Sequence, residues 1–466
     1  MPEFDQPPEF DVIVIGAGPA GETAAGRIAA GGLRTAVVER ELVGGECSYW
    51  GCIPSKTLLR PGDVLAAARR VPGAAEAVTG TIDVQAALAR RDYMTSNWDD
   101  TGQLPWLEEN HITLVRGTAR LTGALAVEVT DAAGGVRRLR AGQAIVLATG
   151  TRSVIPPIPG LAEAKPWTNR EVTALKDIPR RLLVLGGGAV GVEMAQAVKR
   201  LGADEVTLVE GAERVLAREE PFAGEEVEKS FAAEGITVRT RTRVISVRRG
   251  DDGVVRTGLD NGDEVTADEI LVAVGRRPAT DDLGLEQVGL IPGRPIEVDD
   301  RLRAIGDWLY AVGDCNGVAL LTHMGKYQAR IAADVILGKS ITDRSSREAV
   351  PRVTFTDPPV CAVGLTQAQA RERGLNVRVV SCPTGDVAGA YTQGEGITGT
   401  SQLIVDADRE VIVGATFTGP GTAELLHSAT IAIVAKVPLS DLVHAVPSFP
   451  TLSEVWLRLL EAYFPA

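Results

Sequence analysis

Near its start the chain carries a β-rich strand that runs into a glycine-rich turn and then an alanine-rich helix. The apolar run DVIVI (11–15) leads into the turn GAGPAG, whose glycines are Gly16, Gly18 and Gly21, and a second strand, TAVVE, ends at Glu39. In such a unit the first glycine makes the turn, the second lets the backbone approach a pyrophosphate, and the third lets helix and strand pack closely. The helix N-terminus offers N–H donors, and Glu39 would accept from ribose hydroxyls. The pattern predicts a dinucleotide-binding βαβ unit.

The same pattern occurs a second time in the middle of the chain. RLLVL (181–185) reads as a strand, the next turn supplies Gly186, Gly188 and Gly191, and a helical stretch precedes a strand that ends at Glu210. A proline-bearing segment, 151–160, lies between the two units and predicts a crossover linker. Two complete fingerprints predict an α/β protein with two Rossmann-like domains that bind two dinucleotides, or one dinucleotide twice.

Three further segments fit this organisation. ILVAVGRRP (270–278) reads as a buried strand and a turn. LYAVGDCNG (309–317) reads as a strand ending in Gly313-Asp314, where an acid at the mouth of a sheet can hold a polar ligand, although it can also be an ordinary turn residue. From about residue 347, the alternating runs RVTFTD, TSQLIVD and VIVGATFTG, followed by a helical run, predict an antiparallel α+β domain.

Composition narrows the possible partners. The 466 residues carry a net charge of −13, which disfavours nucleic-acid binding because contact with phosphates needs a basic face. No apolar run reaches the ~18 residues of a membrane span. The first residues lack the basic and apolar regions of a secretion signal. The sequence therefore predicts a cytoplasmic protein with no membrane insertion and no nucleic-acid partner.

Two of the five cysteines, Cys47 and Cys52, lie close together in GGECSYWGCIPSK (44–56), called the dithiol segment below. Positions five apart on a regular helix are rotated by ~140°, too far for the ~3.8 Å Cβ separation of a disulfide. We therefore expect an irregular segment at Gly51, with a helix that begins near Pro54. The pair can be redox-active, two buried thiols or half of a metal site. Because no second CxxC or histidine cluster exists, no metal site is predicted.

In this segment the chain resembles the class I flavoprotein disulfide reductases, which include dihydrolipoamide dehydrogenase, glutathione reductase, mercuric reductase and the soluble transhydrogenases. Their motif GG-x-C-x4-C-x-P-[ST]-K matches residues 44–56, and the resemblance runs from about residue 10 to 456. It implies an FAD-binding domain in two parts (1–155 and 280–346), an NAD(P)-binding domain (156–279) and a C-terminal interface or dimerisation domain (347–466). It also implies a homodimer.

The resemblance implies roles for single residues. Cys52 corresponds to the thiol nearest the flavin, held as a thiolate, and Cys47 to the exchange thiol that faces the substrate. Lys56 corresponds to the lysine beside the reactive nitrogen of the flavin, and Glu193 to its ion-pair partner, since a buried lysine would otherwise lose its charge. The alternative for Glu193 is a solvated charge on a helix. The cofactor-binding residues implied in this way are Gly16, Gly18, Gly21, Glu39, Arg40, Gly45, Lys56, Gly150, Gly186, Gly188, Gly191, Glu210, Gly275, Gly313 and Asp314, with Asp314 as the ligand of the FAD ribitol.

Glu210 favours NADH over NADPH as the electron donor. Its carboxylate can bond both ribose hydroxyls of NAD and would repel a 2′-phosphate. Arg214 lies near it in the sequence and would soften this preference.

One departure from the family limits the functional prediction. Members that act on dithiols end with a histidine in HPT-x-x-E, which gives or takes the thiol proton and is oriented by the glutamate. Here the segment reads VPSFPTLSEVW (446–456), so that Phe449 replaces the histidine while Glu454 is kept. His444 lies five residues before Phe449, so aligning it would need an insertion. The substitution argues against an efficient dihydrolipoamide dehydrogenase.

The sequence thus predicts an FAD enzyme that takes hydride from NAD(P)H and passes electrons through a Cys47–Cys52 disulfide to an unidentified small-molecule acceptor. That acceptor can be an unusual disulfide, a quinone or a metal ion. The chain ends without the vicinal cysteines of mercuric reductases and keeps both motif cysteines, unlike the transhydrogenases. Pyridine nucleotide transhydrogenation, or a role as a flavin-bound redox sensor or partner-binding protein, remain the alternatives.

Overall fold

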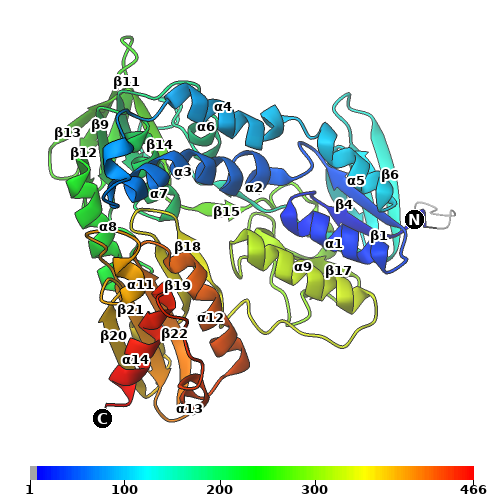
Figure 1. Cartoon of the computed structure of the whole chain (residues 1–466). Coiled ribbons are helices and arrows are strands. Elements are labelled where there is room, and N and C mark those ends of the chain that lie inside the picture. Colours follow the sequence, from blue (N-terminus) through cyan, green and yellow to red (C-terminus); the bar gives the residue numbers. More distant parts are fainter. Residues whose placement is uncertain (1–7, 466) are drawn as a thin grey trace. The chain divides into compact units, whose positions relative to one another are not determined.

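The computed structural model describes residues 8–465, which form two compact units (Figure 1). Unit 1 contains the described part of Met1–Pro54 together with Asp92–Arg152 and Arg276–Arg347. Unit 2 contains Ser55–Arg91, Ser153–Gly275 and the described part of Glu348–Ala466. The chain therefore passes repeatedly from one unit to the other. The ends of the FAD-binding and NAD(P)-binding domains, expected at residues 155, 279 and 346, remain a prediction.

Unit 1 is built on a largely parallel sheet with β1 near its centre. β1 is buried on both faces because Val12, Ile13 and Val14 are apolar in succession, as expected of a strand covered on both sides. β1 pairs in parallel with β2 and with β6, and β17 and β3 extend the sheet in the same direction. In spatial order the strands are β16 (Arg303–Ile305), β17 (Leu309–Ala311), β6 (Val136–Leu147), β1 (Phe10–Ile15), β2 (Thr35–Glu39) and β3 (Ile112–Arg116). β4 (Thr118–Gly123) and β5 (Ala126–Thr130) join the first part of β6 as an antiparallel extension.

The glycine-rich turn of unit 1 forms as predicted. Helix α1 (Pro19–Ala30) begins directly after it and lies beside α9 (Thr322–Ile336) (Figure 1). Gly16 has a φ of +101°, a conformation that side chains disfavour. A Cβ on Gly21 would lie 1.8 Å from the carbonyl oxygen of Gly16, so the helix packs on the turn only because this residue is glycine.

The dithiol segment folds as two helices with a break between them. α2 spans Gly45–Tyr49 and α3 spans Cys52–Arg69, so Trp50 and Gly51 form the irregular joint. The second helix begins at Cys52 rather than near residue 54, because Pro54 is accommodated within its first turn, where proline removes no hydrogen bond. The remaining helices of this part of the chain are α4 (Val84–Met94) and α5 (Leu104–Glu109).

Unit 2 repeats the topology of unit 1. Its parallel sheet has the order β10-β9-β8-β14, which matches β3-β2-β1-β6. A Cβ on Gly191 would lie 1.9 Å from the carbonyl oxygen of Gly186, the same close approach as in the first turn. The two fingerprints therefore form two equivalent turns. The elements are β8 (Arg181–Leu185), α7 (Ala189–Arg200), β9 (Glu205–Val209), α8 (Pro221–Ala233), β10 (Ile236–Arg239) and β14 (Glu269–Val272), with an antiparallel sheet of β11 (Val244–Arg249), β12 (Val255–Leu259) and β13 (Glu264–Ala267).

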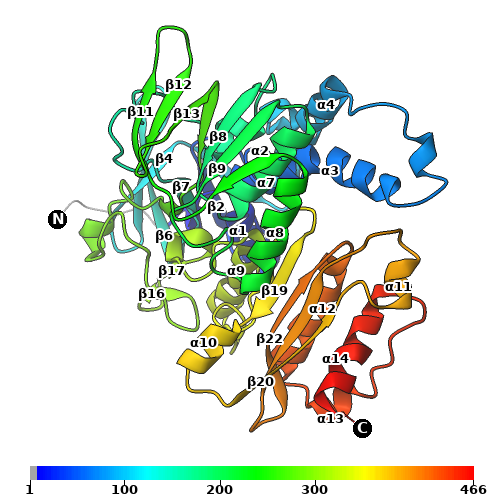
Figure 2. The same cartoon turned by 90° about the vertical axis from the view of Figure 1, so that its left-hand side faces the viewer.

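The C-terminal segment forms the predicted antiparallel α+β layer. Its sheet has five strands, and α12 (Thr422–Ala435) and α14 (Val455–Tyr463) pack on it (Figure 2). The strand order is β18 (Arg352–Thr354), β19 (Val360–Gly364), β22 (Val411–Thr418), β21 (Thr400–Asp406) and β20 (Val377–Pro383). Short helices α6 (Asn169–Thr173), α10 (Gln367–Glu372), α11 (Ala388–Tyr391) and α13 (Leu439–Leu442) complete unit 2, while β7 (Thr151–Ser153) and β15 (Arg276–Pro278) lie where the chain changes units.

The expected strand RVTFTD is shorter than predicted. It ends at Thr354 because the backbone N–H groups of Phe355 and Asp357 donate to side chains of α7, Glu193 Oε1 at 2.9 Å and Gln196 Oε1 at 2.7 Å. This segment therefore binds α7 instead of continuing the sheet.

Within residues 8–465, no helix combines the length and the apolar composition that crossing a bilayer requires.

Candidate active site

The break in the dithiol segment brings the two predicted redox cysteines together. A Cβ on Gly51 would lie 3.0 Å from the carbonyl oxygen of Glu46 and 3.2 Å from the Cα of Cys47, so the chain folds back tightly at this glycine. Tyr49 fixes the end of α2, since its hydroxyl donates to the Val43 carbonyl at 3.0 Å. Its burial raises its pKa to about 12, so the phenol stays neutral.

Both cysteines are present as free thiols, Cys47 half-buried and Cys52 exposed. The hydrogen bond to Cys52, followed by burial, raises the pKa of the Cys47 thiol well above its usual range. The proton of the pair is therefore held on Cys47, which leaves the sulfur of Cys52 as the acceptor.

The other three cysteines lack these features. Burial raises the pKa of Cys315 and of Cys361 to about 12 and that of Cys382 to about 11. Such thiols are poor nucleophiles at neutral pH.

Thr322 is a site residue that sequence reasoning missed. Its hydroxyl oxygen lies 3.3 Å from the sulfur of Cys52, and it is the first residue of α9, a helix of 15 residues. The N-terminus of a helix carries a partial positive charge and free N–H groups, both of which favour a thiolate. Only the tertiary fold brings residue 322 to residue 52, so nothing in the local sequence pointed to this contact.

The first glycine-rich turn packs directly against the dithiol segment. A Cβ on Gly45 would lie 2.6 Å from the Cα of Gly18, so the two backbones touch. Glu39 Oε2 accepts from the N–H of Ala17 at 2.7 Å, and Glu39 Oε1 accepts from the N–H of Glu41, also at 2.7 Å. Arg40 is exposed, and within the described residues its side chain makes no hydrogen bond or ion pair.

Glu22, which the sequence analysis did not single out, lies in the first turn of α1 near Glu39. Burial raises its pKa to about 7, Lys326 opposes the rise, and the negative charge of Glu39 adds to it. A carboxyl group that titrates near neutral pH therefore lies next to the first turn.

Asp314 follows β17 and ends a chain of polar contacts within unit 1. Thr151 donates to Asp314 Oδ2 at 3.0 Å, and Arg276 Nε donates to the Thr151 hydroxyl oxygen at 2.7 Å. Arg276 also forms an ion pair with Glu46, the neighbour of Cys47. Burial raises the pKa of Asp314. The sequence indicated Asp314 but not Arg276, Thr151 or Glu46, because their partners are distant along the chain.

Lys56 and Glu193 form the predicted ion pair, with Lys56 Nζ 2.6 Å from Glu193 Oε2. Glu193 is only 4% exposed, so it is not the solvated helix charge of the alternative interpretation. Its second oxygen accepts from the N–H of Phe355, and Lys56 Nζ lies 4.9 Å from the centre of the Phe355 ring. The carboxylate and the ring contact the ammonium group, and the backbone N–H of Phe355 holds the carboxylate in place.

The second turn has the geometry of the first. Glu210 Oε2 accepts from the N–H of Gly187 at 2.6 Å, and Glu210 Oε1 accepts from the N–H of Ala212 at 2.7 Å. Arg214 is directed elsewhere, since it donates to the carbonyls of Ala217 and Glu219. It therefore does not neutralise Glu210.

Open space surrounds three of the predicted cofactor glycines. Nothing lies within 4 Å of the position where a Cβ would be on Gly150, Gly188 or Gly275. Gly18 and Gly188 precede α1 and α7, and neither helix has a side-chain cap at its start. The N–H groups of both helix starts are therefore available to an anion.

Gly313, by contrast, packs closely on its neighbours. A Cβ on Gly313 would lie 3.2 Å from the Cβ of Ala20, which places the turn before Asp314 against the start of α1.

Phe449 lies on an exposed apolar stretch of unit 2. It is 76% exposed, and Val446 on the same stretch is 85% exposed. Glu454 Oε1 accepts from the N–H of Gly389 at 3.0 Å and from that of Thr451 at 3.1 Å. His444 is exposed as well.

Comparison with known proteins gives consistent matches over nearly the whole chain. Residues 10–333 match the family described as pyridine nucleotide-disulphide oxidoreductase, and residues 350–459 match the dimerisation domain of that family. The chain is 34% identical to the dihydrolipoyl dehydrogenase of Thermus scotoductus, covering 97% of both chains. It is 30% identical to the mercuric reductase of Staphylococcus aureus, covering 97% of this chain and 82% of the relative.

Solved structures show the same fold. The Cu(II) complex of the HOCl-induced flavoprotein disulfide reductase RclA from Escherichia coli has a TM-score of 0.85 at 27% identity, covering 97% of this chain and 99% of the other. LpdA from Mycobacterium tuberculosis has a TM-score of 0.86 at 26% identity, covering 98% of this chain and 100% of the other.

Proposed function

The chain belongs to the pyridine nucleotide-disulphide oxidoreductases, and from this premise we propose a specific reaction. The protein is an FAD-dependent enzyme that takes two electrons from NADH and passes them through Cys52 and Cys47 to a small-molecule acceptor. One observation carries the proposal: the hydrogen-bonded thiol pair whose exposed member, Cys52, also contacts Thr322 at the start of α9.

The residues of unit 1 fit FAD. The uncapped start of α1 would offer N–H groups to a pyrophosphate, Glu39 at the end of β2 would accept from ribose hydroxyls, and Asp314 would bind the ribitol. Bound FAD would supply the two-electron relay between the nicotinamide and the sulfur atoms. Thr151, itself bonded by Arg276, positions Asp314. Arg276 also positions the start of α2 through its ion pair with Glu46.

The thiol pair provides the electron store. Two electrons from NADH cleave the Cys47–Cys52 disulfide; one sulfur then takes a proton and the other keeps a negative charge. We place the proton on Cys47, because its hydrogen bond to Cys52 and its burial raise its pKa, and we expect Thr322 to stabilise the charge on Cys52. The acceptor then removes two electrons, the proton leaves Cys47, and the S–S bond forms again.

The Lys56–Glu193 pair provides a fixed positive charge four residues after Cys52 in the sequence. Lys56 follows Cys52 by four residues on α3, about one helical turn. Glu193 is buried, and its carboxylate fixes the position of the Lys56 ammonium group, whose positive charge favours electron-rich states near it.

NADH is the expected donor. Both oxygens of Glu210 lie at the second turn, and Arg214 is occupied by backbone carbonyls, so the site opposes a 2′-phosphate. The uncapped start of α7 would bind the pyrophosphate of this nucleotide.

The acceptor is a quinone, a metal ion or an unusual disulfide rather than lipoamide. Phenylalanine cannot transfer the proton that a leaving dithiol needs, so Phe449 removes the acid–base step. Two similar proteins are associated by name with metal ions, mercuric reductase and the Cu(II) complex of RclA. We further propose a homodimer, because residues 350–459 match a dimerisation domain and the stretch around Phe449 is apolar and exposed.

An acceptor screen tests this function. The purified protein should contain about one FAD per chain, and NADH should reduce it rapidly without added acceptor. Turnover is then measured with lipoamide, glutathione disulfide, quinones, mercuric and cupric ions and a nicotinamide analogue. Quinone or metal turnover above lipoamide turnover is expected. A protein that binds no flavin after refolding with FAD would refute the proposal, and fast turnover only with the nicotinamide analogue would favour transhydrogenation.

A further inference from the structure

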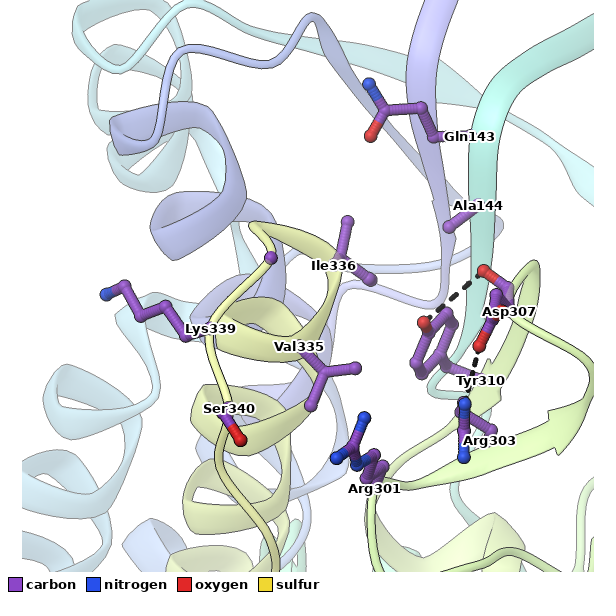
Figure 3. A pocket seen from close by; sticks show the side chains of 11 residues that line it. Gln143, Ala144, Arg301, Arg303, Asp307, Tyr310, Val335, Ile336, Lys339 and Ser340 are labelled. Atoms are coloured by element: carbon purple, nitrogen blue, oxygen red, sulfur yellow. Dashed lines mark hydrogen bonds and ion pairs between the residues drawn. The ribbon is translucent and has the colours of Figure 1, made fainter.

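A cavity of about 290 Å³ lies in unit 1 between the end of α9 and the β16–β17 hairpin (Figure 3). Its lining is more polar than apolar. Arg303 pairs there with Asp299 and with Asp307, and Lys339 pairs with Asp334. Because these ion pairs are complete within the protein, the cavity does not indicate a ligand.

A left-handed turn spans Ser96, Asn97 and Trp98, also in unit 1. The φ values of the three residues are +49°, +53° and +56°. Within residues 8–465, no other non-glycine residues with positive φ follow one another directly. Side chains disfavour this conformation, because the Cβ comes too close to the following carbonyl oxygen. Such a turn persists only where the surrounding structure holds it, and strained residues of this kind concentrate at functional sites.

The turn places Trp98 against the dithiol segment. The indole N–H of Trp98 donates to the carbonyl oxygen of Tyr49 at 3.0 Å. Tyr49 is the last residue of α2 and lies between Cys47 and Cys52 in the sequence. A carbonyl at the end of a helix has no partner within that helix. Trp98 therefore caps α2 at the break that brings the two cysteines together.

The contact between Trp98 and Tyr49 belongs to a closed ring of hydrogen bonds. The hydroxyl of Tyr49 donates to the Val43 carbonyl at 3.0 Å, and the N–H of Val43 donates to Asp100 Oδ2 at 2.7 Å. Asp100 follows Trp98 by two residues and also pairs with Arg116 at the end of β3. Trp98 is half-buried, and the other members of the ring are buried. The chain around Trp98 is therefore joined at two points to α2 and to the residues that precede it.

We propose that Trp98 is a positioning residue for the cysteine pair: its N–H fixes the end of α2, and this holds the sulfur atoms of Cys47 and Cys52 within reach of each other. Holding two reacting groups in place favours the bond between them, because the freedom that they would lose is already restricted. Without the cap, the end of α2 gains freedom in the dithiol state, so the disulfide becomes easier to reduce. The inference rests on the proposed function, since it requires that this pair cycles between dithiol and disulfide.

The equilibrium of the cysteine pair with dithiothreitol tests this role. Two electrons and two protons pass from dithiothreitol to the Cys47–Cys52 disulfide, and the reagent closes to its cyclic disulfide. The full-length protein with bound FAD is equilibrated anaerobically with mixtures of both forms of the reagent. Alkylation then traps the free thiols, and mass spectrometry gives the oxidised fraction of the pair.

Trp98→Phe keeps an aromatic ring and removes the N–H. It should lower the equilibrium constant for disulfide formation about three- to tenfold, the range expected for the loss of one hydrogen bond. Trp106→Phe makes the same substitution in α5, where the ring lies against Gly26 of α1, and is the matched control. It should leave the equilibrium constant unchanged, because its ring does not cap α2.

A second pair of variants changes the turn and keeps the indole. Asn97 is exposed, so neither variant disturbs a core. Asn97→Pro fixes φ at about −65° and cannot adopt the left-handed turn. It should lower the equilibrium constant as Trp98→Phe does. Asn97→Gly adopts positive φ readily and should behave as the wild type does.

The outcomes distinguish this inference from the proposed function. A wild-type protein that forms no Cys47–Cys52 disulfide would refute both. A wild-type disulfide whose equilibrium constant is the same in Trp98→Phe, or falls equally in Trp106→Phe, would overturn the role of Trp98 and leave the proposed function standing. Equal constants for Asn97→Pro and Asn97→Gly would overturn it in the same way.

Discussion

The hydroxyl of Thr322 lies 3.3 Å from the sulfur of Cys52, so the first residue of α9 touches the exposed member of the thiol pair. When Cys52 is a thiolate, Thr322 must be the donor of this hydrogen bond, since a thiolate can only accept. A hydrogen bond to a charged acceptor is roughly twice as strong as a neutral one. The contact therefore couples the charge on Cys52 to a residue far away in the sequence.

Thr322→Val should raise the pKa at which Cys52 reacts, by about one pH unit, because it removes the donor and keeps the shape. The thiolate of Cys52 is the nucleophile, and it predominates only above that pKa. The alkylation of Cys52 in Thr322→Val should therefore shift to higher pH. The rate of iodoacetamide modification of the reduced protein, measured against pH with mass-spectrometric assignment of the site, reports this shift. Thr322→Ser keeps the hydroxyl and should restore the wild-type profile. Superimposable profiles for wild type and Thr322→Val would show that the contact carries no charge stabilisation.

Glu193→Gln should slow the reduction of bound FAD by NADH about tenfold or more. The amide oxygen still accepts from the N–H of Phe355, but Lys56 loses the carboxylate that holds its ammonium group in position. Stopped-flow measurement of flavin bleaching under anaerobic conditions gives the rate. Glu225→Gln, an exposed glutamate of α8, is the control and should leave the rate unchanged. An unaltered rate in Glu193→Gln would remove the ion pair from the mechanism.

NADH should give a higher kcat/KM than NADPH, and Glu210→Ala should narrow the difference about tenfold, because the variant loses the ribose contacts and the repulsion of a 2′-phosphate. Arg214→Gln should not change the preference, since Arg214 is bound to the carbonyls of Ala217 and Glu219. Steady-state kinetics with a quinone as acceptor give kcat/KM for NADH and for NADPH. A wild-type preference for NADPH would mean that another basic group dominates. Arg243, whose Cγ lies 3.8 Å from the Cβ position of Gly211, is the first residue to test in that case.

Phe449→His should raise lipoamide turnover about tenfold or more, since it returns a proton-transferring group to a segment that keeps Glu454. Val446→His places an imidazole on the same exposed stretch and is the matched control, with no gain expected. Both variants are assayed with NADH and lipoamide beside the wild type. Efficient lipoamide turnover by the wild type itself would show that another group supplies the proton and that Phe449 only packs an interface.

Local patterns predicted much of the fold because each of them depends only on a short segment of the sequence. The strands 181–185 and 400–406 have the bounds of the predicted runs RLLVL and TSQLIVD. Both glycine-rich turns form with their acidic partners, Glu39 and Glu210, at the ends of the following strands. A turn that requires a positive φ or the absence of a Cβ needs a glycine, so such a turn can be recognised from the sequence.

Contacts between distant segments could not be read in the same way. Thr322 contacts Cys52, and Arg276 contacts Glu46 and Thr151, although these partners are far apart in the sequence. The predicted strand 352–357 was too long for the same reason: Glu193 and Gln196 of α7 take the backbone N–H groups that a longer strand would have used. Pattern rules describe what a segment favours alone, whereas these residues are set by what packs against them.

An anaerobic reductive titration of the FAD-loaded protein tests the central claim, electron storage on Cys47 and Cys52, most directly. The account predicts uptake of two electron pairs per subunit, one by the flavin and one by the disulfide. After the first pair, it predicts the long-wavelength absorbance band of a thiolate beside oxidised flavin, and this band should be absent in Cys52→Ser. Uptake of a single pair by a fully oxidised sample, with no such band, would contradict the account.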